Sequence, residues 1–389
     1  MHRKILTVAR AEWHSDLLSA VPHDKYGPNI DVQSAADAVI SLATNPLAYH
    51  ALVLDPQASG PWYDTLLDLT LGDTENTIRL LMLGDVKHLD SRLSETVQVN
   101  WPTNAVSFNR ALDQADKKTI EADAELLLEA FSNLDSIRVR YQPVVRLQDM
   151  KPTKVEVLAR VASKTGMIVG PDAIVKAMSS SEFSMSLSSA IIQRALAEHR
   201  DGGFSDLDID FAFNLPLDAV LHPQLLTLLE AVRSLTNIAP KKLRFELTET
   251  QPVTNLAELA STMTKLRDVG YRLSLDDIIP ETPNLAALLG LPFGSVKLDR
   301  SVVANAQHDQ PDIAASARDF ILSVTSQAKQ LHRSVVAEGI ENAETINLLR
   351  ALGVTHGQGY HFARPLPARA LKPWLTHWMG KAADCGVGG

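Results

Sequence analysis

Residues 271–303, 'YRLSLDDIIPETPNLAALLGLPFGSVKLDRSVV', contain two short apolar runs separated by a helical stretch, and each run ends in charged residues. Asp276 and Asp277 end the first run, and Lys297 and Asp299 lie at the end of the second. Lys297 and Asp299 are two residues apart, so in a strand their side chains share one face. The alternation predicts parallel strands joined by helical crossovers.

The same alternation continues from Ile137 towards the C-terminus and predicts one TIM-like (β/α)8 barrel over residues 136–380. Because the carboxyl ends of barrel strands converge on one mouth, polar residues that end successive apolar runs should meet there. We expect this of Glu156, Asn214, Glu246, Asp276, Asp277, Lys297, Asp299, Glu338 and Gln358.

Several carboxylates gathered in one place need compensating cations. A ligand set of carboxylates with one amide, without cysteine or histidine, favours Mg²⁺ or Mn²⁺. Two such ions ~3.5–4 Å apart suit in-line displacement at phosphorus, which indicates hydrolysis of a phosphate ester. A single acid at a strand end is more often a helix cap or a solvated charge. The joint occurrence at successive strand ends favours the site.

Ordered sequence blocks in this region resemble the EAL domain, a phosphodiesterase family that acts on the bacterial messenger cyclic di-GMP. The resemblance runs from about Ala124 to Leu375. The blocks are 'YQPVV' (141–145), 'EVLAR' (156–160), 'FNLP' (213–216), 'FELTET' (245–250), 'LDD' (275–277), 'VKLDRS' (296–301), 'VVAEGIE' (335–341) and 'GQGYHFARPLP' (357–367). In the signature block, Val157 stands where the family has alanine.

The resemblance implies a role for each matching residue and a site with two Mg²⁺ or Mn²⁺ ions that yields the linear dinucleotide pGpG. The metal ligands would be Glu156, Asn214, Glu246, Asp276 and Asp277. Lys297 would orient the attacking water, Glu338 would ligate metal or act as general base, and Gln358 would hold the water or a metal-bound oxygen. Gln142, Arg160 and Asp299 would contact the substrate, with Arg160 on a phosphate. The resemblance also implies a barrel with one antiparallel strand, and a homodimer.

One loop departs from the family pattern. After the two aspartates the family has 'FGTGYSSL' or close to it, whereas residues 278–285 read 'IIPETPNL'. Glycine permits positive φ and proline fixes φ, so we expect another loop conformation. Glu249, which in the family anchors this loop, would then lack its partner. Such a loss of support typically costs ~10–100-fold in metal affinity or activity.

Three functions therefore stay open. The first is a metal-dependent hydrolase of cyclic di-GMP, slow or in need of activation because of the loop. The second is an inactive EAL domain that binds cyclic di-GMP and acts as a sensor or adaptor. The third is a barrel that serves only as a protein scaffold. This hypothesis is the weakest, because a carboxylate cluster without compensating cations would destabilise such a scaffold.

Residues 1–107 predict a separate flavodoxin-like, doubly wound domain. The apolar runs at 4–9, 29–34, 51–55, 79–83 and 96–100 alternate with helical stretches at 11–21, 35–44 and 62–71. This region loosely resembles the receiver domain of two-component signalling, and Asp55 occupies the place of the phosphoacceptor. Ala9 and Arg10 replace the acidic pair, Gly84 the hydroxyl residue and Trp101 the lysine. We therefore expect a degenerate receiver that serves as a structural module or docks a protein partner, with Asp55 an ordinary strand-end acid.

The remaining features set limits on partners and location. Residues 108–135 predict a helical linker, and the glycine-rich end, 381–389, a disordered tail. A net charge of −9 argues against a nucleic acid polymer as partner. No apolar run approaches the ~18 residues of a membrane span. A single cysteine, Cys385, fits a reducing compartment, and we expect a cytoplasmic protein.

Overall fold

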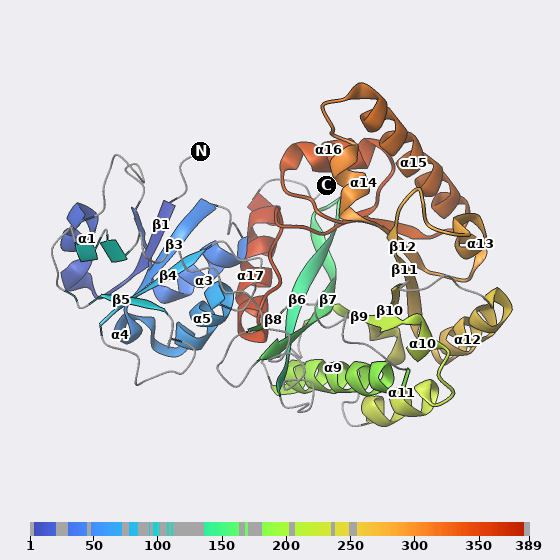
Figure 1. The fold of residues 1–389 in the computed structure, drawn as a ribbon, viewed down its shortest axis with the longest axis horizontal. Helices are drawn as coiled ribbons and strands as arrows, with labels where there is room; N and C mark the ends of the chain where they lie inside the picture. Colours follow the sequence, from blue (N-terminus) through green and yellow to red (C-terminus); the bar gives the residue numbers. More distant parts are fainter. Residues whose placement is uncertain are drawn as a thin grey trace. The chain divides into compact units, whose positions relative to one another are not determined.

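The computed structural model of the chain (Figure 1) describes most residues between 4 and 384. Outside the described residues lie 1–3, 21–29, 45–47, 72–77, 85–92, 94–95, 100, 102–106, 109, 112–135, 163–167, 170–180, 202–206, 235–237, 249–254 and 385–389. The chain divides into two compact units, one made of 1–138 with 159–177 and the other of 139–158 with 178–389.

The first unit contains a five-stranded parallel sheet, in which each strand arises from one of the five predicted runs. The strands are β1 (Lys4–Val8), β2 (Ile30–Val32), β3 (Tyr49–Leu54), β4 (Arg79–Leu83) and β5 (Val97–Val99). Their order is β2-β1-β3-β4-β5, which is the order of flavodoxin-like doubly wound sheets.

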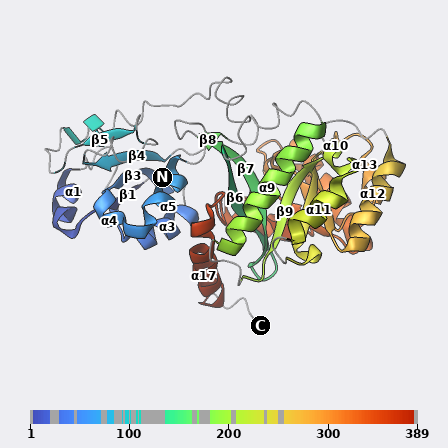
Figure 2. The same ribbon diagram turned by 90° about the horizontal axis from the view of Figure 1, so that it is seen from below.

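Helices follow the strands of this sheet along the chain. They are η1 (Ala11–Trp13), α1 (His14–Ala20), α3 (Ala35–Thr44), α4 (Pro56–Ser59), η3 (Gly60–Trp62) and α5 (Tyr63–Leu71). Helices α3 and α5 pack side by side, with α3 against β1 and α5 against β4 (Figure 2).

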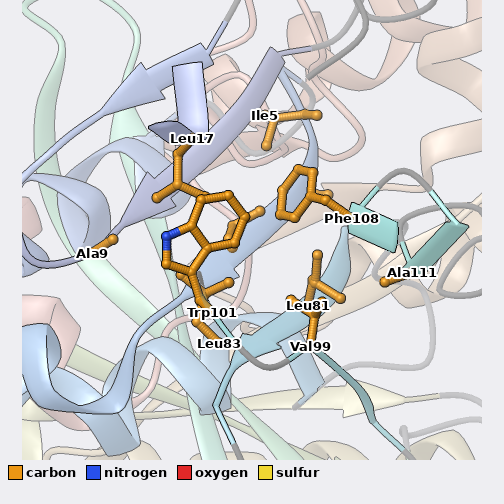
Figure 3. Close-up of a cluster of buried hydrophobic side chains, with 11 residues drawn as sticks. Ile5, Ala9, Leu17, Leu81, Leu83, Val99, Trp101, Phe108 and Ala111 are labelled. Carbon is orange, nitrogen blue, oxygen red and sulfur yellow. The ribbon is translucent and has the colours of Figure 1, made fainter. Parts of the chain in front are cut away.

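The other face of the sheet is covered by an apolar cluster (Figure 3). Alternate strand residues point into it, as the period of two in a strand requires. Trp101 lies inside this cluster, with its ring edge-to-face on Phe108 at 5.5 Å between centroids. Trp101, at the position of the receiver lysine, is therefore a core residue. The cluster consists of Ile5, Ala9, Leu17, Ala51, Val53, Leu81, Leu83, Val99, Trp101, Phe108 and Ala111.

Eight strands form the closed barrel. In spatial order they are β6 (Ile137–Arg146), β14 (His356–Gly357), β13 (Ser334–Ala337), β12 (Ser295–Leu298), β11 (Arg272–Ile278), β10 (Leu243–Thr248), β9 (Asp210–Pro216) and β7 (Lys151–Ala162). Pairing of β6 with β7 closes the ring, and the short β8 (Ile168–Val169) pairs with the end of β7. Strand β6 runs antiparallel to β14, whereas β7 and β9 to β14 run parallel, so one strand is reversed.

Helices surround the barrel strands (Figure 1). They are α9 (Ser181–Asp201), α10 (Leu217–Val220), α11 (Leu225–Ser234), η6 (Pro240–Lys242), α12 (Leu256–Val269), α13 (Leu285–Gly290), α14 (Arg300–Asn305), α15 (Pro311–Gln330), α16 (Ala343–Ala351) and α17 (Ala368–Asp384). None of the helices in the described part of the chain is long and apolar enough to cross a membrane.

The expected disordered tail, 381–389, was placed too early in the sequence. Helix α17 continues to Asp384, so residues 381–384 do not belong to the expected tail. The run 'KAAD' is made mainly of good helix formers and contains no breaker, which explains the continuation. Residues 385–389 lie outside the described residues, as does almost all of the expected linker 108–135.

The barrel strands alternate between an apolar outer face and a polar inner face. On β9, Phe211 and Phe213 point outwards, and Phe213 is near Phe245 of β10, with centroids 6.2 Å apart. Asp210 and Asn214 occupy the alternate positions on the inner side. The outer layer supplies apolar burial under the helices, which leaves the interior for polar groups.

The pKa of His356, on β14, is sensitive to positive charges at the amino ends of the barrel strands. Its ring Nδ1 lies 2.9 Å from Thr355 Oγ1. Burial lowers the pKa of His356 from 6.5 to about 4, and the positive charges of Lys154, Arg146 and Arg244 add to this. The folded protein therefore holds His356 neutral where the unfolded chain would protonate it.

We predict that this histidine makes the free energy of unfolding depend on pH. Since its folded pKa is depressed, the unfolded state binds more protons between pH 4 and pH 6.5, and stability rises with pH across this window. The gain in stability across this window is about 3 kcal/mol, and it is complete above pH 6.5. Urea denaturation of the wild type and of His356→Asn from pH 4 to 7 measures it.

The variant should show a flatter pH dependence than the wild type in this window. His332→Asn is the matched control, because His332 is exposed and asparagine tolerates its positive φ. Equal slopes for wild type and His356→Asn would contradict the prediction.

Candidate active site

Strand register brings the predicted residues to one end of the barrel interior. Glu246 of β10 lies directly opposite Asn214 of β9. Glu156 lies on β7, Lys297 on β12 and Asp276 on β11, and all three are at most 5% exposed. Glu338 directly follows β13 and is half-buried. Side chains that are far apart in the sequence therefore share one small volume.

The ammonium group of Lys297 is the centre of this arrangement. Its Nζ lies 2.6 Å from Glu338 Oε1, 2.8 Å from Glu246 Oε2, 2.8 Å from Asp276 Oδ1 and 3.3 Å from Glu156 Oε2. Burial opposes the charge of Lys297, but Asp276, Glu156, Glu246 and Glu338 outweigh it and raise its pKa well above 10.5. Lys297 is therefore a permanent cation between four carboxyl groups.

Amide side chains hold the carboxylate of Glu156. Asn214 Nδ2 donates to Glu156 Oε1 at 2.8 Å, and Gln358 Nε2 donates to Glu156 Oε2 at 2.7 Å. Gln358 also donates to Gln142 Oε1 at 2.9 Å, and Gln142 donates to the carbonyl of Ala363. Gln142, expected to contact the substrate, thus holds Gln358 in place.

Gly359 is required directly after Gln358. Its φ is +154°, and a Cβ there would lie 2.2 Å from the backbone nitrogen of Ile340. The same close approach lets Ile340 N–H donate to the carbonyl of Gln358 at 3.0 Å. A larger residue at 359 would displace the strand end that carries Gln358.

A second buried cation, Lys154, was not predicted from the sequence. It is 4% exposed, and its Nζ lies 2.9 Å from Glu246 Oε1. Burial alone would raise the pKa of Glu246, but Lys154 and Lys297 outweigh it and lower the pKa to about 2. Lys154 precedes Glu156 by two residues, so the alternation of a strand could have placed both on the inner face.

A bulge in β11 brings both adjacent aspartates to the site. In a regular strand Asp276 and Asp277 would point to opposite faces. The pairing with β12 shifts between Leu275 and Ile278, and Asp277 has a φ of 49°, which is rare outside glycine. As a result, single carboxylate oxygens of Asp276, Asp277 and Glu338 lie within 4.8 Å of one another.

The cluster carries an excess of negative charge. Five carboxyl groups face two ammonium groups, so full ionisation leaves three negative charges uncompensated. Burial raises the pKa of Asp276 well above 3.8, and the neighbouring acids Glu246, Glu338 and Asp277 add to this against the effect of Lys297. Burial raises the pKa of Glu338 to about 7, and Glu156 and Asp277 contribute. Added cations would relieve this repulsion.

The donor set fits hard divalent cations. Two groups of carboxylates share Asp276: one joins it to Glu156 and Glu246, the other to Asp277 and Glu338. Among the described residues, Asn214 Oδ1 and Gln358 Oε1 are buried without a hydrogen-bond partner. Oxygen ligands of this kind suit Mg²⁺ or Mn²⁺, and two adjacent groups fit two ions.

Two other predicted residues, Asp299 and Arg160, make contacts of the following kind. Asp299 caps α14, with its Oδ1 accepting the N–H of Ser301 at 2.8 Å. Arg160 is 3% exposed and donates from Nη1 to the carbonyl of Ala159 at 2.9 Å. Glu249 lies outside the described residues.

The loop after the two aspartates closes on itself. Ile279 N–H donates to Thr282 Oγ1 at 3.0 Å, and Thr282 N–H donates to the carbonyl of Ile279 at 3.1 Å. Asn284 then begins α13 with a φ of 55°. Thr282 and Asn284 thus build a turn without glycine in a segment that contains Pro280 and Pro283.

Asp55 of the first unit is occupied by contacts of its own. It is 1% exposed, and its Oδ2 lies 2.9 Å from Nε of Arg10. Its Oδ1 accepts the N–H of Gln57 and caps α4. Arg10 is stacked on Trp13, with Cζ 3.7 Å from the ring centroid. Asp55 is thus a paired, capping carboxylate.

Comparison with known proteins gives one family and several relatives. The family described as "EAL domain" matches residues 124–365. "Cyclic di-GMP phosphodiesterase NbdA" from Pseudomonas aeruginosa is 29% identical over 285 residues, which are 72% of this chain and 35% of that protein. "Cyclic di-GMP phosphodiesterase PA2567" from the same organism is 28% identical over 272 residues, which are 69% of this chain and 45% of that protein. The chain thus spans less than half the length of either relative.

Among solved structures, the EAL enzyme Bd1971 in its "cAMP and cyclic-di-GMP bound form" is similar to this chain. The TM-score is 0.57 at 25% sequence identity, with 68% of this chain and 70% of that chain covered. The barrel described above is therefore the fold of an EAL enzyme.

We predict that replacing Lys297 by methionine destabilises the protein strongly. The change leaves four carboxyl groups without their common cation, which should lower the free energy of unfolding by about 3–5 kcal/mol. Urea denaturation measures this loss. Excess Mn²⁺ should restore much of it, because the ion compensates the same carboxylates. Lys329→Met, at an exposed position of α15, should change stability by less than about 0.5 kcal/mol.

We also predict that small phosphodonors do not modify Asp55. Its carboxylate is buried, bound to Arg10 and used as a helix cap, so no oxygen is free for attack on phosphorus. Incubation with acetyl phosphate and Mg²⁺ should yield no phosphoryl adduct by intact-protein mass spectrometry. An adduct that peptide mapping places on Asp55 would refute this.

Proposed function

Because this chain belongs to the EAL domain family, we propose that it is a hydrolase that cleaves cyclic di-GMP to linear pGpG with the help of Mg²⁺ or Mn²⁺. The supporting observation is the cluster of five carboxyl groups, Glu156, Glu246, Asp276, Asp277 and Glu338, within the barrel. Relatives named as cyclic di-GMP phosphodiesterases add support.

Glu156, Asn214, Glu246, Asp276 and Asp277 would hold two divalent ions. When bound, such ions activate a water molecule and neutralise the charge of the phosphoryl oxygens. The shared position of Asp276 in both carboxylate groups supports two neighbouring ions. The oxygens of Asn214 and Gln358, which are buried and have no hydrogen-bond partner among the described residues, are available as further acceptors or ligands.

In the proposed reaction the oxygen of water attacks one phosphorus atom of the cyclic dinucleotide. The bond from phosphorus to the 3′ oxygen breaks, and this oxygen takes a proton from solvent water. Glu338 is half-buried next to Asp277 and takes the proton of the attacking water. Lys297 orients that water and stabilises the developing negative charge. Gln358, directly after β14, holds the same water, and Arg160, in the 'EVLAR' block, meets a phosphate.

A second candidate function is binding of cyclic di-GMP without cleavage. It is favoured by the loop 279–284, which departs from the family sequence, and by the pairing of both oxygens of Glu246 with lysines. In this case the chain would be a sensor that passes the bound state to a protein partner.

The location, the protein partner and the oligomeric state that we propose follow from the sequence. The protein would act in the cytoplasm, the first unit would dock a protein partner, and the barrel would form a homodimer. Size-exclusion chromatography with light scattering measures the last of these.

The hydrolase proposal predicts turnover that depends on Glu156. Purified protein, cyclic di-GMP and Mn²⁺ or Mg²⁺ should give pGpG by liquid chromatography. Glu156→Gln should reduce the rate by 100-fold or more, because the change removes a metal-ligand charge and loosens Asn214 and Gln358, ~10²-fold being a usual loss for such groups.

Glu344→Gln is the matched control, since Glu344 is exposed in the first turn of α16. It should retain the wild-type rate. Tight binding of cyclic di-GMP with no product in either metal would remove the hydrolase and leave the sensor. Absence of binding would remove both.

A further inference from the structure

Lys154 is buried at the inner face of β7, at the boundary between two zones of charge. It is two residues before Glu156, and it lies opposite Asp210 of β9 in the strand register. Above it, towards the carboxyl ends of the strands, is the acidic cluster. With 4% exposure, its ammonium group must find compensation inside the protein.

Glu246 is the acidic partner of Lys154. The two groups are 2.9 Å apart, and this is the ion pair of Lys154 within the described part of the chain. Asp210 is engaged by other cations: Arg244 at 2.7 Å, with Lys242 and Arg272 more distant. Lys154 is therefore directed to the acidic cluster.

Like charges oppose a retreat of Lys154 from Glu246. In the strand register Lys154 is opposite Asp210, and Arg244 is bound to that aspartate at 2.7 Å, so a second cation is near the amino ends of these strands. Movement of the ammonium group away from Glu246 towards Asp210 would bring it to a carboxylate that Arg244 already holds. The contact with Glu246 is consequently a low-energy position that costs free energy to leave.

Because of the contact between Lys154 and Glu246, the two clusters of three acids differ in the number of positive charges next to them. In the group of Glu156, Glu246 and Asp276, both oxygens of Glu246 are paired with ammonium groups, Oε1 with Lys154 and Oε2 with Lys297. The group of Asp276, Asp277 and Glu338 shares Lys297 but has no described contact with Lys154. A cation that enters the first group must therefore compete with one more positive charge.

We propose that Lys154 is a positioning residue that competes with a divalent cation for Glu246, so that the two metal positions of the proposed hydrolase fill in sequence. The position at Asp276 and Asp277 fills first. The position of Glu156, Glu246 and Asp276 fills only when Lys154 gives up Glu246 Oε1, and this limits the metal affinity of the site. The inference rests on the metal dependence of the proposed function.

Titration calorimetry of the metal-free full chain with MnCl₂ tests this order. The wild type should bind two ions in separate phases whose dissociation constants differ by about tenfold or more, since a unit charge next to the ion weakens its binding. Asp277→Asn should remove or weaken the tighter phase and leave the weaker one.

Lys154→Met should tighten the weaker phase by about tenfold and leave the tighter phase in place. Lys154→Gln, which keeps a hydrogen-bond donor for Glu246 and removes the charge, should act in the same direction. Thermal unfolding is a second readout, in which both variants should gain more stability from Mn²⁺ than the wild type. This second readout also detects variants that fold only with the ion.

Lys151→Met is the matched control, because Lys151 is exposed at the start of the same strand and carries the same charge. An equal tightening in Lys151→Met, or unchanged Mn²⁺ binding in both Lys154 variants, would overturn the inference alone. If no variant binds Mn²⁺, the inference and the metal-dependent function both fail. Binding that depends on Lys154 without hydrolysis would keep the inference and remove the hydrolase.

Discussion

The contact of one buried ammonium group with four carboxyl groups constrains the whole barrel. Lys297 is 1% exposed, and leaving such a charge unpaired inside a protein costs several kcal/mol. Its partners come from β7, β10, β11 and the end of β13, so the charge is satisfied only when these strands keep their register. A shift by one residue in any of them would turn its acid to the outer face. The site and the barrel therefore form together.

The barrel separates the source of its stability from the place of its chemistry. Outward residues such as Phe213, Phe245 and Tyr271 form a layer of aromatic contacts under the helices. The inner positions of the same strands carry amides, acids and lysines instead of the branched apolar residues that fill many α/β barrels. Because burial on the outside stabilises the strands, the interior can hold an acidic cluster that by itself opposes folding. Lys154 and Lys297 reduce that opposition, and the remaining negative charge is suited to divalent cations.

The first unit also alternates strands and helices, but the residues at its strand ends make different contacts from those in the barrel. At the end of β1, Arg10 occupies a position where a receiver needs an acid, and it pairs with Asp55. Trp101, after β5, enters the apolar cluster with Phe108. The strand ends that would hold a metal ion and a phosphoryl group are thus filled by an internal ion pair and by core packing. In the described residues of the first unit, these strand ends therefore serve internal pairing and core packing.

Much of this molecule could be predicted from local sequence patterns. The five strands of the first unit, the barrel and the residues that converge within it all follow from apolar runs with periods of 2 and 3.6 and from acids at the run ends. The family membership follows from ordered blocks such as 'EVLAR' and 'FELTET'. These features are local, because each depends on a few neighbouring residues and on the shared direction of parallel strands.

What only the tertiary structure decided concerns the direction and pairing of individual side chains. The alternation of a strand would turn Asp277 away from Asp276, and only the bulge against β12 brings both to one site. In the local sequence 'KVEV', nothing distinguishes Lys154 from an exposed lysine. Only the register of β7, β9 and β10 makes it the partner of Glu246. Likewise Gln142 and Asp299, which by motif would contact a ligand, are bound to Gln358 and Ser301. Such pairings join residues as many as 216 positions apart, and their energies depend on distances that no short stretch of sequence contains.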